Sequence, residues 1–211
     1  MSTRRINFSY NYKYNLFIKR IIDIFLSILG LILFGWIILL SFLISSMDTR
    51  SNGFFTQDRV GQNKRLFKVI KIKTMRNESN NESTVTVRSD PRVTKAGYIF
   101  RKYKIDELPQ LINVLKGTMS LVGPRPTVVE DMQKMNETQI NRFKVKPGLT
   151  GLAQINGNTE LTWPQRIEYD LEYIKKQSLS LDFKIIIKTF QLLFKGNIET
   201  HPRGKDEWIE I

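Results

Sequence analysis

The residues best suited to chemistry in this sequence are two adjacent carboxylates, Asp106 and Glu107, and an arginine held between two prolines, Arg125. The carboxylates open the stretch 106–126, and the arginine lies at its end. A carboxylate pair near a helix N-terminus, followed by a fixed guanidinium, indicates a site that handles phosphate groups. The alternative is structural: Asp106 would only cap a helix, and Glu107 would be an ordinary acid of its first turn.

A short helix is expected to position these carboxylates. Four apolar residues recur at helical spacing and give the stretch one apolar face: Leu108, Leu111, Ile112 and Leu115. Pro109 suits the first helical turn, and Gly117 suits the position just past the last one. Asp106 is therefore predicted at or near the helix N-terminus, where unpaired N–H groups and the helix dipole favour negative charge.

The composition narrows the class of protein. A chain of 211 residues is long enough for one domain with a sizeable core and an appendage. The absence of cysteine excludes disulfides and thiolate metal sites. The net charge of +13 and the pI near 9.9 indicate anionic partners, such as nucleic acid, phospholipid headgroups or phosphorylated substrates. No nucleic-acid-binding motif accompanies this charge, so we expect no nucleic-acid partner.

An uncharged, almost wholly apolar run at 24–46 identifies a membrane protein. As a helix it would extend roughly 34 Å, enough to cross a hydrocarbon core of about 30 Å. A cleaved signal peptide is disfavoured, because the run begins late, is long, and lacks a small-x-small site after Ser46. We therefore expect a retained anchor.

Two topologies are open for this anchor, because basic residues flank it on both sides. The flanking basic residues are Arg4, Arg5, Lys13, Lys19 and Arg20 before the run, and Arg50, Arg59, Lys64 and Arg65 after it. Positive charge marks the cytoplasmic side, so a straight span would place one cluster outside. A helix that enters and returns would keep both clusters in the cytoplasm, and its break is expected at Gly30 or Gly35.

Where the anchor begins, Asp23 follows Lys19 and Arg20 by four and three residues. This spacing places the three side chains on one helix face, where they can form an ion pair. From the spacing alone, the favoured interpretation is an ordinary surface pair at the end of an anchor.

A β-hairpin is predicted over 54–75, with its turn at Gly61, Gln62 and Asn63. Lys68, Lys71 and Lys73 make one side basic, which is either a solvated face or a surface for lipid headgroups. Residues 76–90 are predicted as a mobile loop and residues 93–104 as a helix.

The C-terminal half is predicted to hold three helices, over 128–143, 163–176 and 183–195. The last would be capped by Asp182 and end at Gly196, and its lysines suit either a membrane interface or packing into the core. Between the first two lies a glycine-rich stretch, 144–157, in which the backbone could approach a ligand closely. His201, the only histidine, lies in a polar tail and is assigned no role.

Taken together, the stretches resemble the bacterial sugar transferase family, the small monotopic polyprenyl-phosphate phosphoglycosyl transferases. The resemblance covers residues 15–196 and rests on motifs in a fixed order. These are Lys19-Arg20-x-x-Asp23, Phe55-x-Gln57-x-Arg59-x-Gly61, Phe67-x-x-x-Lys71-x-Lys73-Thr74-Met75, Asp106-Glu107-Leu108-Pro109-Gln110, Asn113-Val-Leu-Lys-Gly117, Met119-Ser-Leu-Val-Gly-Pro-Arg-Pro126, Lys146-Pro-Gly-Leu-Thr-Gly151 and Ala153-Gln-Ile-Asn-Gly157.

The resemblance implies transfer of a sugar phosphate from a UDP-sugar to a polyprenyl phosphate with release of UMP, which begins the synthesis of a bacterial envelope glycan. It implies Asp106 as the nucleophile that forms a covalent phosphosugar intermediate, and Mg²⁺ as cofactor, held by Asp106 and Glu107. Glu107 could instead handle the proton of the acceptor. Arg125, Lys71 and Arg59 would bind the substrate phosphates, since cations must neutralise their charge.

Further implied residues surround this centre. UDP-sugar contacts are expected from Lys146, Gly148, Gly151, Gln154, Asn156 and Asp170, and contacts where the membrane helix begins from Lys19, Arg20 and Asp23. The family usually has Ser-Pro at the middle of the apolar helix, where this chain has Gly35 and Trp36. Proline breaks a helix, whereas glycine adds only flexibility. The doubly basic flanks still favour the re-entrant form.

The expected fold is α+β and mostly helical, with an N-terminal re-entrant membrane helix and a compact cytoplasmic domain containing a small β-hairpin and interfacial amphipathic helices. The expected parts are a basic segment 1–20, the membrane helix 21–46, the catalytic domain 47–196 and a polar tail 197–211. The protein would lie in the bacterial inner membrane with its active site on the cytoplasmic face, in contact with lipids, and could form a homo-oligomer. The alternative is a non-catalytic, membrane-anchored basic module that binds acidic lipids or an envelope protein.

Overall fold

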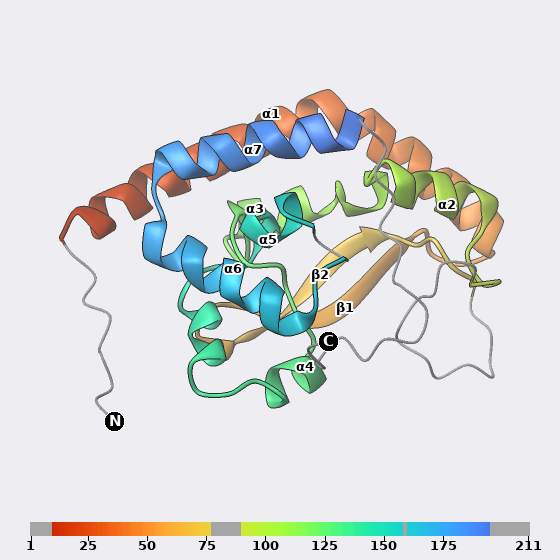
Figure 1. The fold of residues 1–211 in the computed structure, drawn as a ribbon. Helices are drawn as coiled ribbons and strands as arrows, with labels where there is room; N and C mark the ends of the chain where they lie inside the picture. The colour runs from red at the N-terminus through yellow and green to blue at the C-terminus, as the bar shows by residue number, and fades with distance from the viewer. Residues whose placement is uncertain (1–9, 77–89, 158–159, 195–211) are drawn as a thin grey trace.

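The computed structural model describes residues 10–76, 90–157 and 160–194. This part of the chain is mostly helical and contains two small two-stranded sheets, as Figure 1 shows. The prediction of a mostly helical protein with a β-hairpin and one long apolar N-terminal helix is confirmed. The loop predicted over 76–90 and the polar tail with His201 lie outside the described residues, except for Arg76 and Asp90.

The long apolar helix, α1 (Tyr10–Thr49), lies along the globular domain through most of its length (Figure 1). Its buried positions are spaced by three, four or eleven residues, which places them in one stripe along the helix: Asp23, Ser27, Ile38, Ser41, Ser45 and Thr49. Other faces expose large apolar side chains, including Phe17, Phe25, Ile32, Trp36 and Met47. Within the described residues it is the one helix long and apolar enough to cross a membrane.

α1 continues through Gly30 and Gly35 without interruption, so the break expected at one of these glycines was wrong. Glycine keeps its N–H group, so the helical hydrogen bonds can persist where a proline would remove one. A Cβ on Gly30 would lie 3.0 Å from Leu111 Cδ1, so this glycine lets α1 approach the helix that follows the carboxylate pair. Gly35 has no atom within 4 Å of such a Cβ.

The predicted hairpin is confirmed as β1 (Phe54–Val60) and β2 (Leu66–Ile72), which pair antiparallel around a 3₁₀ turn, η1 (Gln62–Lys64). A second, parallel pair, β3 (Ser120–Val122) and β4 (Gly148–Thr150), was not predicted. Strands of three residues next to glycines show no alternating pattern that could reveal them.

The carboxylate pair lies between two helices. α2 (Lys95–Lys102) confirms the helix predicted over 93–104. Asp106 and Glu107 then form a 3₁₀ turn, η2 (Ile105–Glu107), and the predicted helix begins only after Pro109, as α3 (Gln110–Lys116). The carboxylates thus lie one turn before the helix, not in its first turn. Gly117 ends α3 in a left-handed conformation (φ 80°), as predicted.

The single helix predicted over 128–143 was wrong. Two shorter elements replace it, α4 (Val129–Gln133) and the 3₁₀ helix η3 (Gln139–Lys144). Asn136 explains the break, because its side-chain oxygen accepts hydrogen bonds from the backbone N–H groups of Thr138 and Gln139. Such a local turn competes with the helical ladder.

The remaining helices are α5 (Leu152–Ile155), α6 (Trp163–Lys176) and α7 (Leu179–Phe194). α6 has the predicted bounds. α7 begins earlier than predicted, because Ser178 rather than Asp182 accepts a hydrogen bond from the first turn, from Leu181 N. α7 buries Ile185 completely and exposes Phe183, Ile187 and Phe190, so it both packs on the core and presents an apolar face.

Candidate functional site

Asp106 and Glu107 are buried, with exposed fractions of 8% and 7%. A single side chain, Asn113 of α3, aligns their turn with strand β2. The side-chain oxygen of Asn113 accepts a hydrogen bond from Ile70 N at 3.1 Å, and its side-chain nitrogen donates to the backbone carbonyl oxygen of Lys68 at 2.7 Å. The strand is thereby fixed so that its next residue, Lys71, reaches Glu107.

Glu107 binds two cations at once. Lys71 Nζ donates to Glu107 Oε1 at 2.6 Å, and Arg125 donates to the two carboxylate oxygens at 2.7 and 3.3 Å. Burial alone would raise the pKa of Glu107, but Arg125 and Lys71 outweigh it and hold that pKa well below its ordinary value. Glu107 is therefore ionised at neutral pH, which favours a role in organising charge over a role in handling protons.

Asp106 differs from its neighbour. Burial raises the pKa of Asp106 to about 6, against the opposing charge of Lys71. Its Oδ1 atom is buried and has no hydrogen-bond partner in the described part of the chain. A buried polar atom without a partner is uncommon in folded proteins and often marks a functional group. This carboxylate oxygen is thus available to a reacting atom or a cation.

Cations surround the pair. Arg59 donates to Gln57 Oε1 at 2.6 Å, and burial together with the nearby Arg125 lowers the pKa of Arg59 to about 10. Lys104 and Arg101 also act on Asp106 electrostatically. Positive charges that are gathered in a partly buried site favour the binding of an anion. The structure therefore brings Lys71, Arg59 and Arg125 together around Asp106 and Glu107, the arrangement expected for the predicted phosphate site.

The two predicted loop glycines, Gly148 and Gly151, contact the chain itself. A Cβ on Gly148 would lie 2.1 Å from Gly123 N, and one on Gly151 would lie 2.2 Å from Gly123 O. These glycines thus let β4 and the following turn meet the backbone just before Pro124 and Arg125. The Gly148 N–H donates to the Pro124 carbonyl oxygen at 2.8 Å.

The other residues predicted to contact the UDP-sugar have different surroundings. Gln154 has a buried amide whose nitrogen and oxygen both lack a partner within the described residues. Asn156 donates to the Leu152 carbonyl oxygen at 2.8 Å. Lys146 lies near Arg20 of α1, and burial together with this charge lowers the pKa of Lys146.

Asp170 forms a fully buried ion pair with Arg142, a residue that sequence reasoning missed. Arg142 donates to Asp170 Oδ2 at 2.6 and 2.9 Å, and both side chains are 2% exposed. Arg142 also donates to the Arg125 carbonyl oxygen at 3.0 Å, and with Gly61 it lines a small recess next to Arg125. Asp170 thus stabilises the loop that carries Arg125, through Arg142. A buried basic residue at one position of a polar 3₁₀ segment gives no sequence signal for such a role.

We expect Asp170→Asn to lower the free energy of unfolding by about 3–5 kcal/mol, because it leaves the buried Arg142 charge uncompensated. Urea unfolding of the purified chain in detergent measures this. A variant as stable as the wild type that has lost affinity for a UDP-sugar would instead support direct substrate contact by Asp170.

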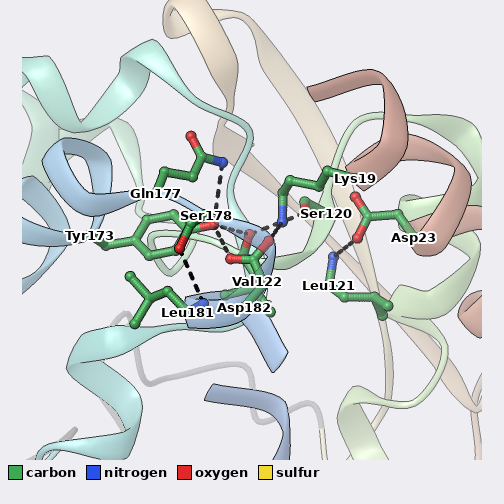
Figure 2. A network of polar contacts seen from close by, with 10 residues as sticks. All are labelled: Lys19, Asp23, Ser120, Leu121, Val122, Tyr173, Gln177, Ser178, Leu181 and Asp182. Atoms are coloured by element: carbon green, nitrogen blue, oxygen red, sulfur yellow. Dashed lines mark hydrogen bonds and ion pairs between the residues drawn. The ribbon is translucent and has the colours of Figure 1, made fainter. Parts of the chain in front are cut away.

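Lys19, Arg20 and Asp23 bind the globular domain rather than each other. Lys19 Nζ lies 2.5 Å from Asp182 of α7. Arg20 donates to two backbone carbonyl oxygens in the last turn of α3. Asp23 accepts a hydrogen bond from Leu121 N at 3.1 Å, as Figure 2 shows. The beginning of the apolar helix is therefore tied to both α3 and β3.

The described side chains around Asp106 supply only some of the ligands that a divalent cation needs. No group of three or more histidine or acidic side chains with metal-binding geometry occurs among the residues that the structure describes. Asp106 and Glu107 nevertheless offer the oxygen donors that Mg²⁺ prefers, and Asp106 Oδ1 is unpartnered. The remaining ligands would be phosphate oxygens and water, the usual arrangement for Mg²⁺ in phosphate chemistry.

Comparison with known proteins identifies related chains. A family model described as "Bacterial sugar transferase" matches residues 14–196. "Galactosyl transferase CpsE" of Streptococcus agalactiae is 41% identical over 202 residues, 88% of this chain and 44% of that protein. "Uncharacterized sugar transferase EpsL" of Bacillus subtilis is 40% identical over 82% of this chain and 85% of its own length. "UDP-glucose:undecaprenyl-phosphate glucose-1-phosphate transferase" of Escherichia coli is 40% identical over 86% of this chain and 40% of its own length. The chain thus spans less than half of the first and third relatives.

Proposed function

The chain belongs to the bacterial sugar transferase family, and from this membership we propose that it transfers a sugar phosphate from a UDP-sugar to a polyprenyl phosphate, releasing UMP. The E. coli relative is named for this reaction with UDP-glucose and undecaprenyl phosphate. The observation that supports the proposal best is the buried Asp106–Glu107 pair, held against Lys71 and Arg125. The product would begin a bacterial polysaccharide or glycoprotein glycan.

In the proposed reaction Asp106 acts as the nucleophile. One carboxylate oxygen attacks the phosphorus that bears the sugar, a new O–P bond forms, and the bond to UMP breaks. An oxygen of the polyprenyl phosphate then attacks the same phosphorus, and the bond to Asp106 breaks. Its unpartnered Oδ1 supports this role, because no hydrogen bond within the described residues must be broken before attack.

The surrounding side chains stabilise charge. Arg125, Lys71 and Arg59 lie where they can neutralise the diphosphate, which would otherwise repel the carboxylate nucleophile. Glu107 keeps Arg125 and Lys71 in place. We include Mg²⁺ in the proposal, held by Asp106 and Glu107. Such an ion supplies further neutralisation of phosphate oxygens.

The proposal is tested by incubating the purified full chain with polyprenyl phosphate and a panel of UDP-sugars, and measuring UMP. We expect UMP from at least one UDP-sugar, with dependence on Mg²⁺ that is lost on chelation and restored by added metal. The absence of UMP with every sugar would refute the reaction. Salt-sensitive binding to acidic vesicles that is indifferent to Asp106 would then support the non-catalytic module.

The pH profile should report Asp106. Because its pKa is raised to about 6, Asp106 is protonated and unreactive below that pH and ionised above it. We expect kcat/KM for the UDP-sugar to rise about tenfold per pH unit below pH 6 and to level off above it. Initial rates in constant ionic strength buffers measure this, and a profile that is flat from pH 4.5 to 7.5 would contradict it.

We further propose that the chain is anchored in one leaflet of the bacterial inner membrane, with α1 re-entering and the site on the cytoplasmic face. Both ends of α1 support this, because Asp23 binds Leu121 of the domain near one end and Ser45 binds the Lys73 carbonyl oxygen near the other. A straight span would separate those contacts across the bilayer. The apolar faces of α1 and α7 would meet the lipid.

Single cysteines test this topology, since the chain has none of its own. We expect cysteines at Ser2 and at Asn52, which precede and follow α1 in the sequence, to resist a membrane-impermeant maleimide in intact cells and to react after permeabilisation. Labelling of either position in intact cells would contradict the re-entrant arrangement. A cysteine in a known periplasmic protein of the same cells serves as the labelling control.

A further inference from the structure

The strand that leads to Arg125 is held along one edge by side chains rather than by another strand. β3 pairs with β4 on its first edge. On its second edge, the Leu121 N–H donates to Asp23 Oδ1 at 3.1 Å, and the Val122 carbonyl oxygen lies 3.2 Å from the hydroxyl of Tyr173 (Figure 2). Two paired strands of three residues are too short to be stable alone, so these side-chain contacts are needed to fix β3.

These contacts belong to one buried network. The single hydroxyl proton of Tyr173 is shared between two acceptors, Asp182 Oδ1 at 2.7 Å and the Val122 carbonyl oxygen at 3.2 Å. Lys19 binds the other oxygen of Asp182 at 2.5 Å. We call Lys19, Asp23, Tyr173 and Asp182 the polar junction; Figure 2 shows them gathered around β3. All four side chains are buried or nearly so, which makes their hydrogen bonds costly to lose.

Three of the four residues of the polar junction lie on α1 and α7, both of which expose large apolar side chains. Lys19 and Asp23 come from α1, Asp182 from α7, and Tyr173 from α6. Near these residues α1 exposes Phe17 and Phe25, and α7 exposes Phe183 and Phe190. A change in the position of α1 or α7 on the globular domain must therefore alter the hydrogen bonds that hold β3.

β3 in turn determines where Arg125 lies. Only Gly123 and Pro124 separate Val122 from Arg125, and both are held to the β4 strand by backbone hydrogen bonds. Arg125 reaches Glu107 from this fixed backbone at 2.7 Å. A shift of β3 is thus carried directly to the guanidinium that faces the phosphate site.

We propose that Tyr173 and Asp182 are positioning residues for Arg125, and that the polar junction couples the seating of α1 and α7 to the phosphate site. The inference rests on the proposed function, because Arg125 is assigned there to bind substrate phosphate. It adds to that function a requirement: α1 and α7 must be correctly positioned before the chain can react efficiently with the UDP-sugar.

A double-mutant cycle tests the link to Arg125. The full chain is placed in nanodiscs of phosphatidylethanolamine and phosphatidylglycerol, and UMP release is measured for Tyr173→Phe, Arg125→Lys and both together. We expect Tyr173→Phe to lower kcat/KM about tenfold in the wild-type background, but less than twofold when Arg125 is already lysine. Losses that simply multiply would overturn the proposal, because they would show that Tyr173 acts independently of Arg125.

Hydrogen exchange gives a second readout that needs no substrate. Tyr173→Phe and Lys19→Met should each speed exchange of the Leu121 and Gly123 amides at least tenfold, while the matched surface change Lys176→Met should not. Unchanged exchange in both junction variants would overturn the proposal. A wild type that releases no UMP refutes the proposed function instead, and the exchange rates still decide whether the junction holds β3. If Tyr173→Phe fails to fold, Lys19→Met carries both measurements.

Discussion

Asp106→Asn is expected to abolish turnover and, at the same time, to make the protein more stable. The loss of activity should be on the order of 10⁴-fold or more, because an amide cannot replace the carboxylate as nucleophile. UMP release and capture of a ³²P-labelled enzyme intermediate from a UDP-sugar labelled in its sugar-linked phosphate both measure this. The labelled intermediate should disappear together with turnover.

The gain in stability follows from the raised pKa of Asp106. A folded-state pKa of about 6, above the ordinary 3.8, means that the folded protein holds this proton more tightly than the unfolded chain. Between these two values the free energy of unfolding falls as pH rises, so at neutral pH the buried ionised carboxylate is destabilising. Replacing it with Asn should raise the free energy of unfolding by about 1–3 kcal/mol at pH 7.5, and by much less at pH 4.

This combination separates catalysis from folding, because a variant that is inactive and more stable cannot be inactive through unfolding. Asp48→Asn, which changes a partly exposed carboxylate paired with Arg76, is the matched control: it should keep turnover within a factor of two and leave the free energy of unfolding unchanged. Retention of turnover by Asp106→Asn would show that another group is the nucleophile.

Glu107→Gln is expected to reduce kcat/KM by about 10²–10³-fold while lowering stability. The variant keeps the shape of the side chain but loses the charge that binds Lys71 and Arg125 together. The pKa of Glu107 is held below its ordinary value, so its ionised form stabilises the fold above that value, and this stabilisation is lost as pH falls. We expect the free energy of unfolding at pH 7 to fall by about 1–3 kcal/mol.

The adjacent carboxylates thus have opposite effects on stability, which makes each the control for the other. Steady-state kinetics and urea unfolding at pH 7 measure both quantities for Glu107→Gln. Glu172→Gln, at an exposed helical ion pair with Lys176, is the surface comparison and should change neither. A Glu107→Gln variant with normal kcat/KM would show that the two cations do not depend on this carboxylate.

Elements with a strong local pattern were predicted well. The helix at 163–176 and the hairpin at 54–75 are periodic over many residues and carry clear end signals. The parallel strands β3 and β4 could not be predicted, because a pair of three-residue strands exists only through contacts distant in sequence. The break at Asn136 was missed because a side-chain turn can override a polar helical pattern.

The same division applies to the site. Asp106, Glu107, Lys71 and Arg125 were predicted from motifs, and the structure brings them together. The supporting residues were not predicted, because Asn113 and Arg142 act through hydrogen bonds to backbone groups that are far away in the sequence: Ile70 and Lys68 for the first, Arg125 for the second. Asn113 at least lies within a recognised motif, whereas nothing in the sequence distinguishes Arg142.

The meeting of Gly123, Gly148 and Gly151 has a consequence for the evolution and engineering of donor choice. At each of these positions even a methyl group would overlap the backbone of the opposing segment. The backbone of this loop therefore cannot be varied one residue at a time. Under the proposed function, a change of sugar preference introduced in this loop would have to come from side chains attached to it. Gln154, whose buried amide lacks a partner within the described residues, is the first position at which a library should be diversified.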